Sequence, residues 1–204
     1  MTRGTTDAAA APEIELAPLV ARLAAGPQPW VLLVDGRSGA GKTVLATRLA
    51  TATGAALVSL DDVYPGWDGL AAGAAAVPAI VRDGRWRRWD WVRDRPGDAA
   101  SVDRSGSLIV EGCGAISRAS RPLADHAWWL DRDATERKAR ALGRDGDAYA
   151  PHWERWAAQE EEFARREGSR ALADLVLTGG DAAVAASRPA HAHPRRCSSS
   201  SSMP

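Results

Sequence analysis

Eight consecutive residues near the start of the chain have the composition of a phosphate-binding loop. They read Gly36-Arg37-Ser38-Gly39-Ala40-Gly41-Lys42-Thr43, which fits the pattern GxxxxGK[ST]. Glycines let main-chain N–H groups approach a phosphate closely, a lysine adds a mobile charge for the β- and γ-phosphates, and a threonine hydroxyl can coordinate Mg²⁺. The run therefore predicts that all eight residues hold ATP, that Lys42 also acts in catalysis, and that Thr43 binds Mg²⁺.

Two further features support this interpretation. Only Lys42 and Lys138 are lysines among the 26 basic residues, so a lysine inside the glycine loop is not expected by chance. The loop also stands between an apolar run at 30–34, typical of a strand buried on both faces of a parallel sheet, and a helical pattern of apolar residues from Val44 to Ala52. A glycine-rich turn with no ligand is the alternative, and this setting disfavours it.

The other apolar runs predict the rest of an α/β fold. Four more strands are expected at 55–60, 108–110, 127–130 and 175–177. Three of them end at acidic residues, Asp61, Glu111 and Asp131, and ligands gather at the carboxyl ends of strands in open α/β sheets. We expect a P-loop NTPase fold with three α/β/α layers, a five-stranded and mainly parallel sheet, and a small helical lid.

Two of these acidic residues are candidates for the chemistry of phosphoryl transfer. Such a reaction needs Mg²⁺ and often a carboxylate that takes the proton of the acceptor hydroxyl. Asp61 would face the glycine loop and could serve as that base, and Glu111 could orient the water around Mg²⁺. A loop start or helix cap is the alternative for Asp61, and an incidental charge is the alternative for Glu111.

Arginines mark the expected lid, about residues 134–167. Helical stretches at 134–142 and 152–167 are separated by a turn-rich segment at 143–151. Arg137, Arg140 and Arg144 lie on one helix face because they are three and four residues apart, and like charges there repel unless they share an anion. A solvated face balanced by acidic residues is the other interpretation.

At these positions the chain resembles the uridine kinase and phosphoribulokinase family of P-loop kinases, over about residues 30–180. The resemblance rests on the loop and on four further motifs, namely Asp61-Asp62-Val63-Tyr64, Glu111-Gly112, Asp131-Arg132-Asp133 before the arginines, and Ala173-Asp174-Leu175-Val176. It implies that Asp61 is the general base and that Arg140 and Arg144 are catalytic cations above the phosphates.

Two segments are candidates for the acceptor site. In residues 64–69, Asp68 could accept hydrogen bonds from ribose hydroxyls, and Tyr64 or Trp67 could stack on a base. In residues 85–95, Trp89 and Asp90 stand where the resemblance implies a pocket wall, and a packed edge strand or a single-stranded nucleic acid site is the alternative. Together with Asp61 and Arg137, these five residues form the predicted substrate site.

The expected function is an ATP-dependent kinase for a small-molecule hydroxyl, with a uridine- or cytidine-like nucleoside as the first candidate. A sugar, a pantothenate-like alcohol or a nucleoside monophosphate stays open as acceptor, and a monophosphate would need extra cations such as those among Arg82, Arg85, Arg87 and Arg88. An ATPase module that acts on a partner protein is the alternative outside the kinases.

Composition limits the partners and the location. Basic and acidic residues balance at 26 each, so no overall field favours nucleic acid or anionic lipid. The longest uncharged stretch, 69–81, is too short for a membrane helix, and residues 1–12 lack a secretory signal, so we expect a cytoplasmic protein. We expect one kinase domain at 1–180 and a disordered tail at 181–204. The sequence leaves open whether the chain forms homo-oligomers.

Overall fold

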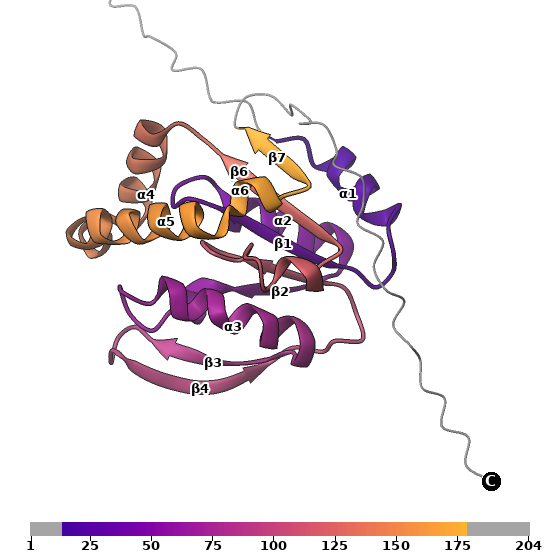
Figure 1. The fold of residues 1–204 in the computed structure, drawn as a ribbon, viewed down its shortest axis with the longest axis horizontal. Coiled ribbons are helices and arrows are strands. Elements are labelled where there is room, and N and C mark those ends of the chain that lie inside the picture. Colours follow the sequence, from indigo (N-terminus) through magenta and orange to yellow (C-terminus); the bar gives the residue numbers. More distant parts are fainter. Residues whose placement is uncertain (1–13, 179–204) are drawn as a thin grey trace, which may run out of the picture.

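A five-stranded parallel sheet forms the centre of the molecule (Figure 1). In this computed structural model, residues 14–178 are described, apart from the side chains of residues 145 and 147. The strands are β1 (Val31–Gly36), β2 (Ala56–Ser59), β5 (Leu108–Glu111), β6 (His126–Asp131) and β7 (Leu175–Thr178), in the order β2-β5-β1-β6-β7. Every neighbouring pair is parallel, so the predicted fold is confirmed and its sheet is parallel throughout.

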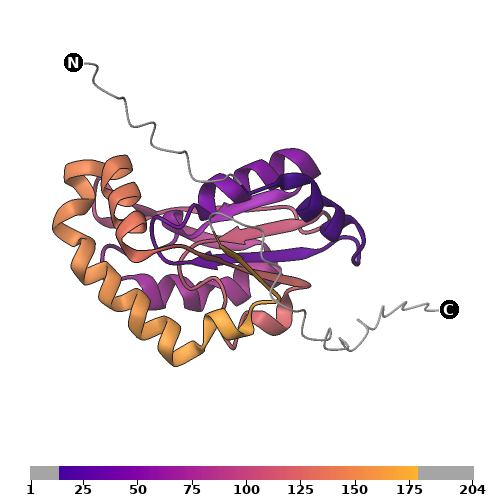
Figure 2. The ribbon, with the colours of Figure 1, turned by 90° about the horizontal axis from the view of Figure 1, so that it is seen from above.

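Helices cover both faces of this sheet, which gives the three expected layers (Figure 2). On one face lie α1 (Leu16–Ala24) and α2 (Lys42–Thr53). On the other lie α3 (Leu70–Asp83), α5 (Trp153–Glu167) and α6 (Ser169–Leu172). Helix α4 (Ala134–Tyr149) projects beyond the sheet with the first part of α5. Short 3₁₀ turns occur at Leu60–Asp62, Arg121–Leu123 and Ala150–His152.

The continuous apolar run of β1 is explained by burial on both of its faces. Val31 and Leu33 belong to the core formed with α3 and α5, whereas Leu32 and Val34 belong to the core formed with α1 and α2. A strand between two helical layers has no solvent-facing side, so it needs no polar alternation. This position fixes the following loop at the carboxyl edge of the sheet.

The prediction of a turn-rich segment at 143–151 is wrong, because the chain stays helical through most of these residues. Helix α4 continues to Tyr149, and its one non-helical residue is Gly146, which absorbs a kink at φ 52° and ψ −134°. Pro151 lies in the first turn of the short helix that follows, where its missing N–H costs nothing. Glycine and proline therefore bend the lid here without ending it.

Residues 85–101 form an antiparallel hairpin of β3 (Arg85–Asp90) and β4 (Arg95–Ser101), separate from the main sheet. Helix α3 precedes this hairpin at residues 70–83, where no element was predicted, and it accommodates Pro78 in its interior.

Among residues 14–178, no helix is long and apolar enough to cross a membrane. The predicted tail at 181–204 lies outside the described residues.

Asp35 ties the end of β1 to the loop that follows β5. Its buried carboxylate accepts hydrogen bonds from the N–H groups of Gly36 at 2.6 Å, Gly114 at 3.1 Å and Ile116 at 2.9 Å. Burial raises the pKa of Asp35 to about 6, although these hydrogen bonds and the charge of Lys42 oppose the shift. The start of the glycine loop is thus anchored by a carboxylate with no contact to solvent.

We expect Asp35→Asn to lower the free energy of unfolding by about 1–3 kcal/mol, measured by urea denaturation at pH 7. The volume is unchanged, but an NH₂ group must replace one of the two oxygens that accept main-chain N–H groups. Asp98→Asn, at an exposed position of β4, is the matched control. Equal stability of the parent and Asp35→Asn would contradict the anchoring role.

The loss in free energy of unfolding caused by Asp35→Asn should depend on pH. Because the pKa of Asp35 is raised from 3.8 to about 6 in the folded state, the folded protein binds the extra proton between these values, and the stability from this group falls as the pH rises through that window. The difference between parent and Asp35→Asn should therefore be about 2 kcal/mol larger at pH 4 than at pH 7.

Candidate active site

The glycine loop wraps around the N-terminus of α2. Gly39 and Gly41 have φ angles of 81° and 103°, which residues with a Cβ rarely adopt, and α2 begins directly after them at Lys42. Free N–H groups at a helix start, together with the helix dipole, form a site for an anion. The local sequence thus produces the nest-shaped loop that its pattern predicts.

Lys42 is held inside this nest. Its side-chain Nζ donates to the carbonyl oxygen of Arg37 and to Sγ of Cys113, both at 3.3 Å. Burial alone would lower the pKa of Lys42, but the surrounding acidic groups, Glu160 and Glu111 among them, raise it by more. The ammonium therefore stays charged. Burial also raises the pKa of the Cys113 thiol far above its usual range, so this neighbour is neutral.

Thr43 and Glu111, the two predicted metal-site residues, lie together beside the loop. The Thr43 hydroxyl donates to Oε1 of Glu111 at 3.2 Å, and the Ser59 hydroxyl donates to the same oxygen at 2.6 Å. Burial raises the pKa of Glu111, against the opposing charge of Lys42. Within residues 14–178, no cluster of three or more His, Cys, Asp or Glu side chains could hold a metal by itself.

This arrangement fits Mg²⁺, which is usually bound through few protein ligands, several waters and the phosphates of a nucleotide. Thr43 would supply its hydroxyl, and Glu111 would orient a metal-bound water. The hydroxyl and the carboxylate are 3.2 Å apart, so both lie close enough to serve the same ion.

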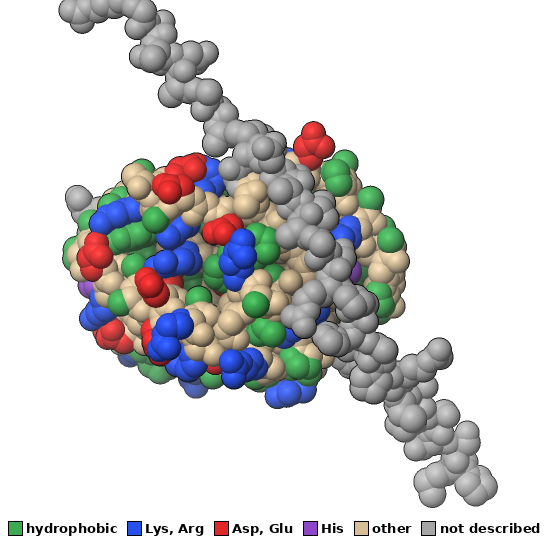
Figure 3. Space-filling model, turned by 45° about the horizontal axis from the view of Figure 1, so that its top comes forward, with side chains coloured by type: hydrophobic (Ala, Val, Ile, Leu, Met, Phe, Trp, Pro, Cys, Tyr) green, Lys and Arg blue, Asp and Glu red, His purple; other side chains and the backbone are tan. Residues whose placement is uncertain are grey.

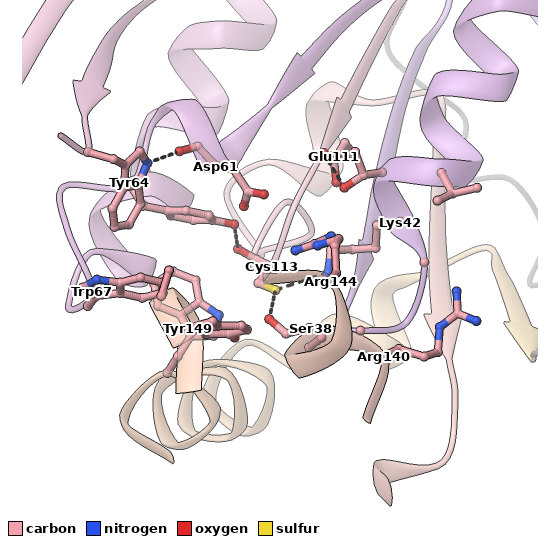
Figure 4. A pocket seen from close by; sticks show the side chains of 18 residues that line it. Ser38, Lys42, Asp61, Tyr64, Trp67, Glu111, Cys113, Arg140, Arg144 and Tyr149 are labelled. Carbon is pink, nitrogen blue, oxygen red and sulfur yellow. Dashed lines mark hydrogen bonds between the residues drawn. The ribbon is translucent and has the colours of Figure 1, made fainter. Parts of the chain in front are cut away.

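A cavity of about 770 Å³ opens beside the loop and has two chemically different ends. Its phosphate end is formed by Ser38, Gly39, Gly41, Lys42, Thr43 and Glu111, with Arg140 and Arg144 of α4. Its other end is formed by Asp61 and by Tyr64, Trp67, Trp91, Tyr149 and Trp156. In Figure 4 the aromatic rings and Lys42 lie on opposite sides, and Asp61 projects into the space between them.

Asp61 lies in the 3₁₀ turn after β2, as the sequence analysis expected of a residue facing the glycine loop. The capping residue of this turn is Ser59, whose hydroxyl accepts the N–H of Asp61 at 3.4 Å, so Asp61 itself is not the cap. The indole of Trp91 donates to the main-chain oxygen of Asp61 at 2.7 Å. This contact fixes the backbone and leaves the carboxylate beside the cavity.

Arg140 and Arg144 line the cavity, but Arg137 does not. The Arg137 side chain is buried and donates to the main-chain oxygens of Ser38 at 3.1 Å and Arg132 at 3.2 Å. Burial, and after it the nearby Arg37, lowers the pKa of Arg137. The prediction that Arg137 contacts the substrate is corrected accordingly, because this side chain binds the main chain of the loop outside the cavity.

Tyr64 and Trp67 lie in the cavity wall, as expected. The Tyr64 hydroxyl donates to the main-chain oxygen of Cys113 at 2.9 Å. The Trp67 ring stacks on Tyr149, with centroids 5.3 Å apart, and on His152, with centroids 4.3 Å apart. Residues from the β2 end and from the lid thus form one aromatic wall.

The other three predicted substrate residues lie away from the cavity lining. Asp68 is exposed and faces Arg155 at 3.4 Å, and Asp90 pairs with Arg93 at 2.9 Å in the turn of the hairpin. Trp89 directly follows a change of register in β3, between Arg87 and Trp89, and does not line the cavity. The turn after β3 instead brings Trp91 to the site, with its ring 5.0 Å from that of Trp67.

Seven lining residues were not predicted as site residues, and four of them, Trp91, Cys113, Tyr149 and Trp156, carry an aromatic ring or a thiol. Trp91 lies in residues 85–95, where only Trp89 and Asp90 were candidates, and Tyr149 lies in the segment expected to be turn-rich. No role was predicted for Cys113 or Trp156, and the buried Trp156 ring both packs in the core and borders the cavity. Tyr149 could have been predicted if the helix at 134–142 had been extended through residues 143–149, as the structure shows.

Known structures share this fold. A possible uridine kinase from Bacillus stearothermophilus is 17% identical, with a TM-score of 0.55 over 79% of this chain and 96% of that one. A protein provisionally described as a fructose transport system kinase, from Silicibacter sp. TM1040, is 21% identical, with a TM-score of 0.52 over 80% of this chain and 99% of that one. No family model and no curated protein matches the sequence.

These likenesses confirm, at the level of the fold, the resemblance to uridine kinases that the motifs indicated. The chain has a kinase-like P-loop fold.

We expect Glu111→Gln to raise the Mg²⁺ concentration needed for half-maximal ATP binding by about 10-fold or more, since a neutral amide orients metal-bound water less strongly than a carboxylate. ATP binding is measured as a function of MgCl₂ concentration. Thr43→Ser, which keeps the hydroxyl, should shift the curve much less. The same Mg²⁺ dependence in parent and Glu111→Gln would remove Glu111 from the metal site.

Proposed function

We propose that this chain is a kinase that transfers the γ-phosphoryl group of Mg·ATP to a hydroxyl of a small molecule. The observation that carries the proposal is the position of Asp61, which borders the same cavity as Lys42 and the glycine loop and projects between Lys42 and the aromatic rings. A kinase needs this geometry, because the acceptor hydroxyl must lie between a base and the phosphoryl group.

The residues divide the reaction among themselves. Main-chain N–H groups of the loop and the Lys42 ammonium bind the β- and γ-phosphates, and Arg140 and Arg144 offer positive charge to the phosphoryl group as it moves. Asp61 accepts the hydroxyl proton as the oxygen attacks phosphorus and ADP leaves. Mg²⁺ bound near Thr43 and Glu111 would neutralise charge on the β- and γ-oxygens.

The aromatic end of the cavity favours an acceptor without negative charge. Its only charged lining residue is Asp61, and all the lining cations (Lys42, Arg140 and Arg144) belong to the phosphate end. None of the arginines that a nucleoside monophosphate would need (Arg82, Arg85, Arg87 and Arg88) lines the cavity. Arg88 lies instead 3.8 Å from Asp62. These observations support a neutral alcohol over a phosphorylated one.

Among neutral alcohols, a uridine- or cytidine-like nucleoside is our first candidate. Stacking of a base on tryptophan or tyrosine contributes about 1–3 kcal/mol, and five such side chains line the cavity. A sugar is the second candidate, favoured because Asp68, the residue predicted to hold ribose, does not line the cavity. We propose no nucleic acid partner, because basic and acidic residues balance at 26 each, and both kinds of side chain occur on the face drawn in Figure 3.

Lys42→Ala should weaken Mg·ATP binding by about 10- to 100-fold, because charge-assisted hydrogen bonds contribute about 1.5–3 kcal/mol. Titration calorimetry at matched salt measures the affinity. Lys138→Ala is the matched control, because Lys138 is exposed and pairs with Glu154. No heat from the parent protein, or equal affinity of the parent and Lys42→Ala, would contradict the nucleotide site.

Asp61→Asn should leave the affinity for Mg·ATP within about threefold of the parent and lower turnover by about 10²-fold or more, the scale of a general base. ADP release is measured with a panel of nucleosides and sugars. Asp62→Asn is the neighbouring control and should keep most of the turnover. If no acceptor stimulates ADP release, the kinase assignment fails and an ATPase module becomes the better interpretation.

A further inference from the structure

Glu160 of the lid helix α5 is a buried carboxylate at the phosphate loop that the proposed mechanism does not use. Its Oε1 accepts the main-chain N–H of Ser38 at 2.8 Å and the Ser38 hydroxyl at 2.5 Å. The Cys113 thiol at 3.0 Å and the Trp156 indole at 3.1 Å donate to the same oxygen. Oε2 faces Nε of Arg37 at 3.5 Å. One lid side chain therefore holds two consecutive residues of the loop.

The lid grips Ser38 from both sides of its peptide backbone. Glu160 binds the N–H of Ser38, while Arg137 of α4 binds its carbonyl oxygen at 3.1 Å. The next residue, Gly39, packs so closely that an added Cβ would collide with the main-chain oxygen of Arg137. The first half of the loop is thus shaped by the lid, whereas its second half opens α2 and belongs to the core.

Glu160 does not occupy the place of a phosphate. Its side chain is only 2% exposed, and it is not among the residues that line the cavity. The Cys113 thiol contacts both Glu160 and Lys42 and stands between them. Glu160 instead supports the loop from the lid side.

The same oxygen also connects the loop to the aromatic end. Trp156, one turn before Glu160, donates to it and meets the Tyr64 ring edge to face at 4.9 Å. Both rings border the cavity. The aromatic wall and Ser38 therefore share one hydrogen-bonded carboxylate oxygen.

We propose that Glu160 is a positioning residue that holds residues 37–39 in the conformation that binds nucleotide and couples this half of the loop to the lid. The inference rests on the proposed function, because the conformation in question is the one that binds Mg·ATP. What matters is the position of Oε1, which accepts both groups of Ser38, because Arg37 is also held by the main-chain oxygen of Ala157 at 3.1 Å. Glutamine can supply that oxygen, and aspartate, shorter by one methylene, cannot reach Ser38.

The experiment compares Mg·ATP affinity by titration calorimetry for Glu160→Gln, Glu160→Asp and Glu160→Ala. We expect Glu160→Gln to stay within about threefold of the parent and Glu160→Asp and Glu160→Ala to bind at least about 10-fold more weakly, from the loss of hydrogen bonds to a buried group. Glu162→Ala, on the same helix but paired with Arg165 outside the site, is the control and should bind as the parent does. Urea denaturation at the assay temperature checks that each variant is folded.

The pattern distinguishes the alternatives. A role of Glu160 through its charge alone would spare Glu160→Asp and impair Glu160→Gln, and this reversed order would overturn the inference. Parent-like or tighter binding by Glu160→Ala would overturn it too, and would leave the kinase proposal intact. If Glu160→Ala does not fold, the comparison of Glu160→Asp with Glu160→Gln decides. A parent that binds no Mg·ATP refutes the proposed function first, and the inference with it.

Discussion

The loop between β1 and α2 can offer the N–H groups at the start of α2 to an anion only while neighbouring elements hold its other polar groups, and the rest of this structure depends on that constraint. The loop cannot satisfy its own polar groups, so neighbouring elements hold it from outside. Asp35 anchors its beginning, α2 continues from its end, and Glu160 and Arg137 hold Ser38 between them. Buried charges are used where they can accept or donate several hydrogen bonds at once.

The site is divided by charge as well as by place. Cations gather where a triphosphate would lie, and aromatic rings gather at the other end around the single carboxylate of Asp61. For the proposed reaction, such a division would orient the two substrates without a separate domain for each, because each substrate would have only one end that suits its charge. The parallel sheet brings these groups together, because the loop, Asp61 and Glu111 all follow strands that end at one edge.

The lid contributes to both ends. Arg140 and Arg144 of α4 reach the phosphate end, and Tyr149 and Trp156 belong to the aromatic wall. The kink at Gly146 separates these two groups along the helix, so one continuous segment can face two chemically different surfaces. A lid that touches both substrates can also exclude water from the space between them, which favours transfer to the acceptor over hydrolysis.

The sequence by itself determined the parts whose signal is local. The glycine loop, the five strands and the acidic residues at their ends follow from composition and periodicity within a few residues, and the structure places Lys42, Thr43, Asp61 and Glu111 accordingly. Only the tertiary structure decided which arginine reaches the cavity, which tryptophan borders it, and that Glu160 holds the loop. These depend on a kink, a register shift and contacts across about 120 residues, and no periodic pattern records where such distant groups meet.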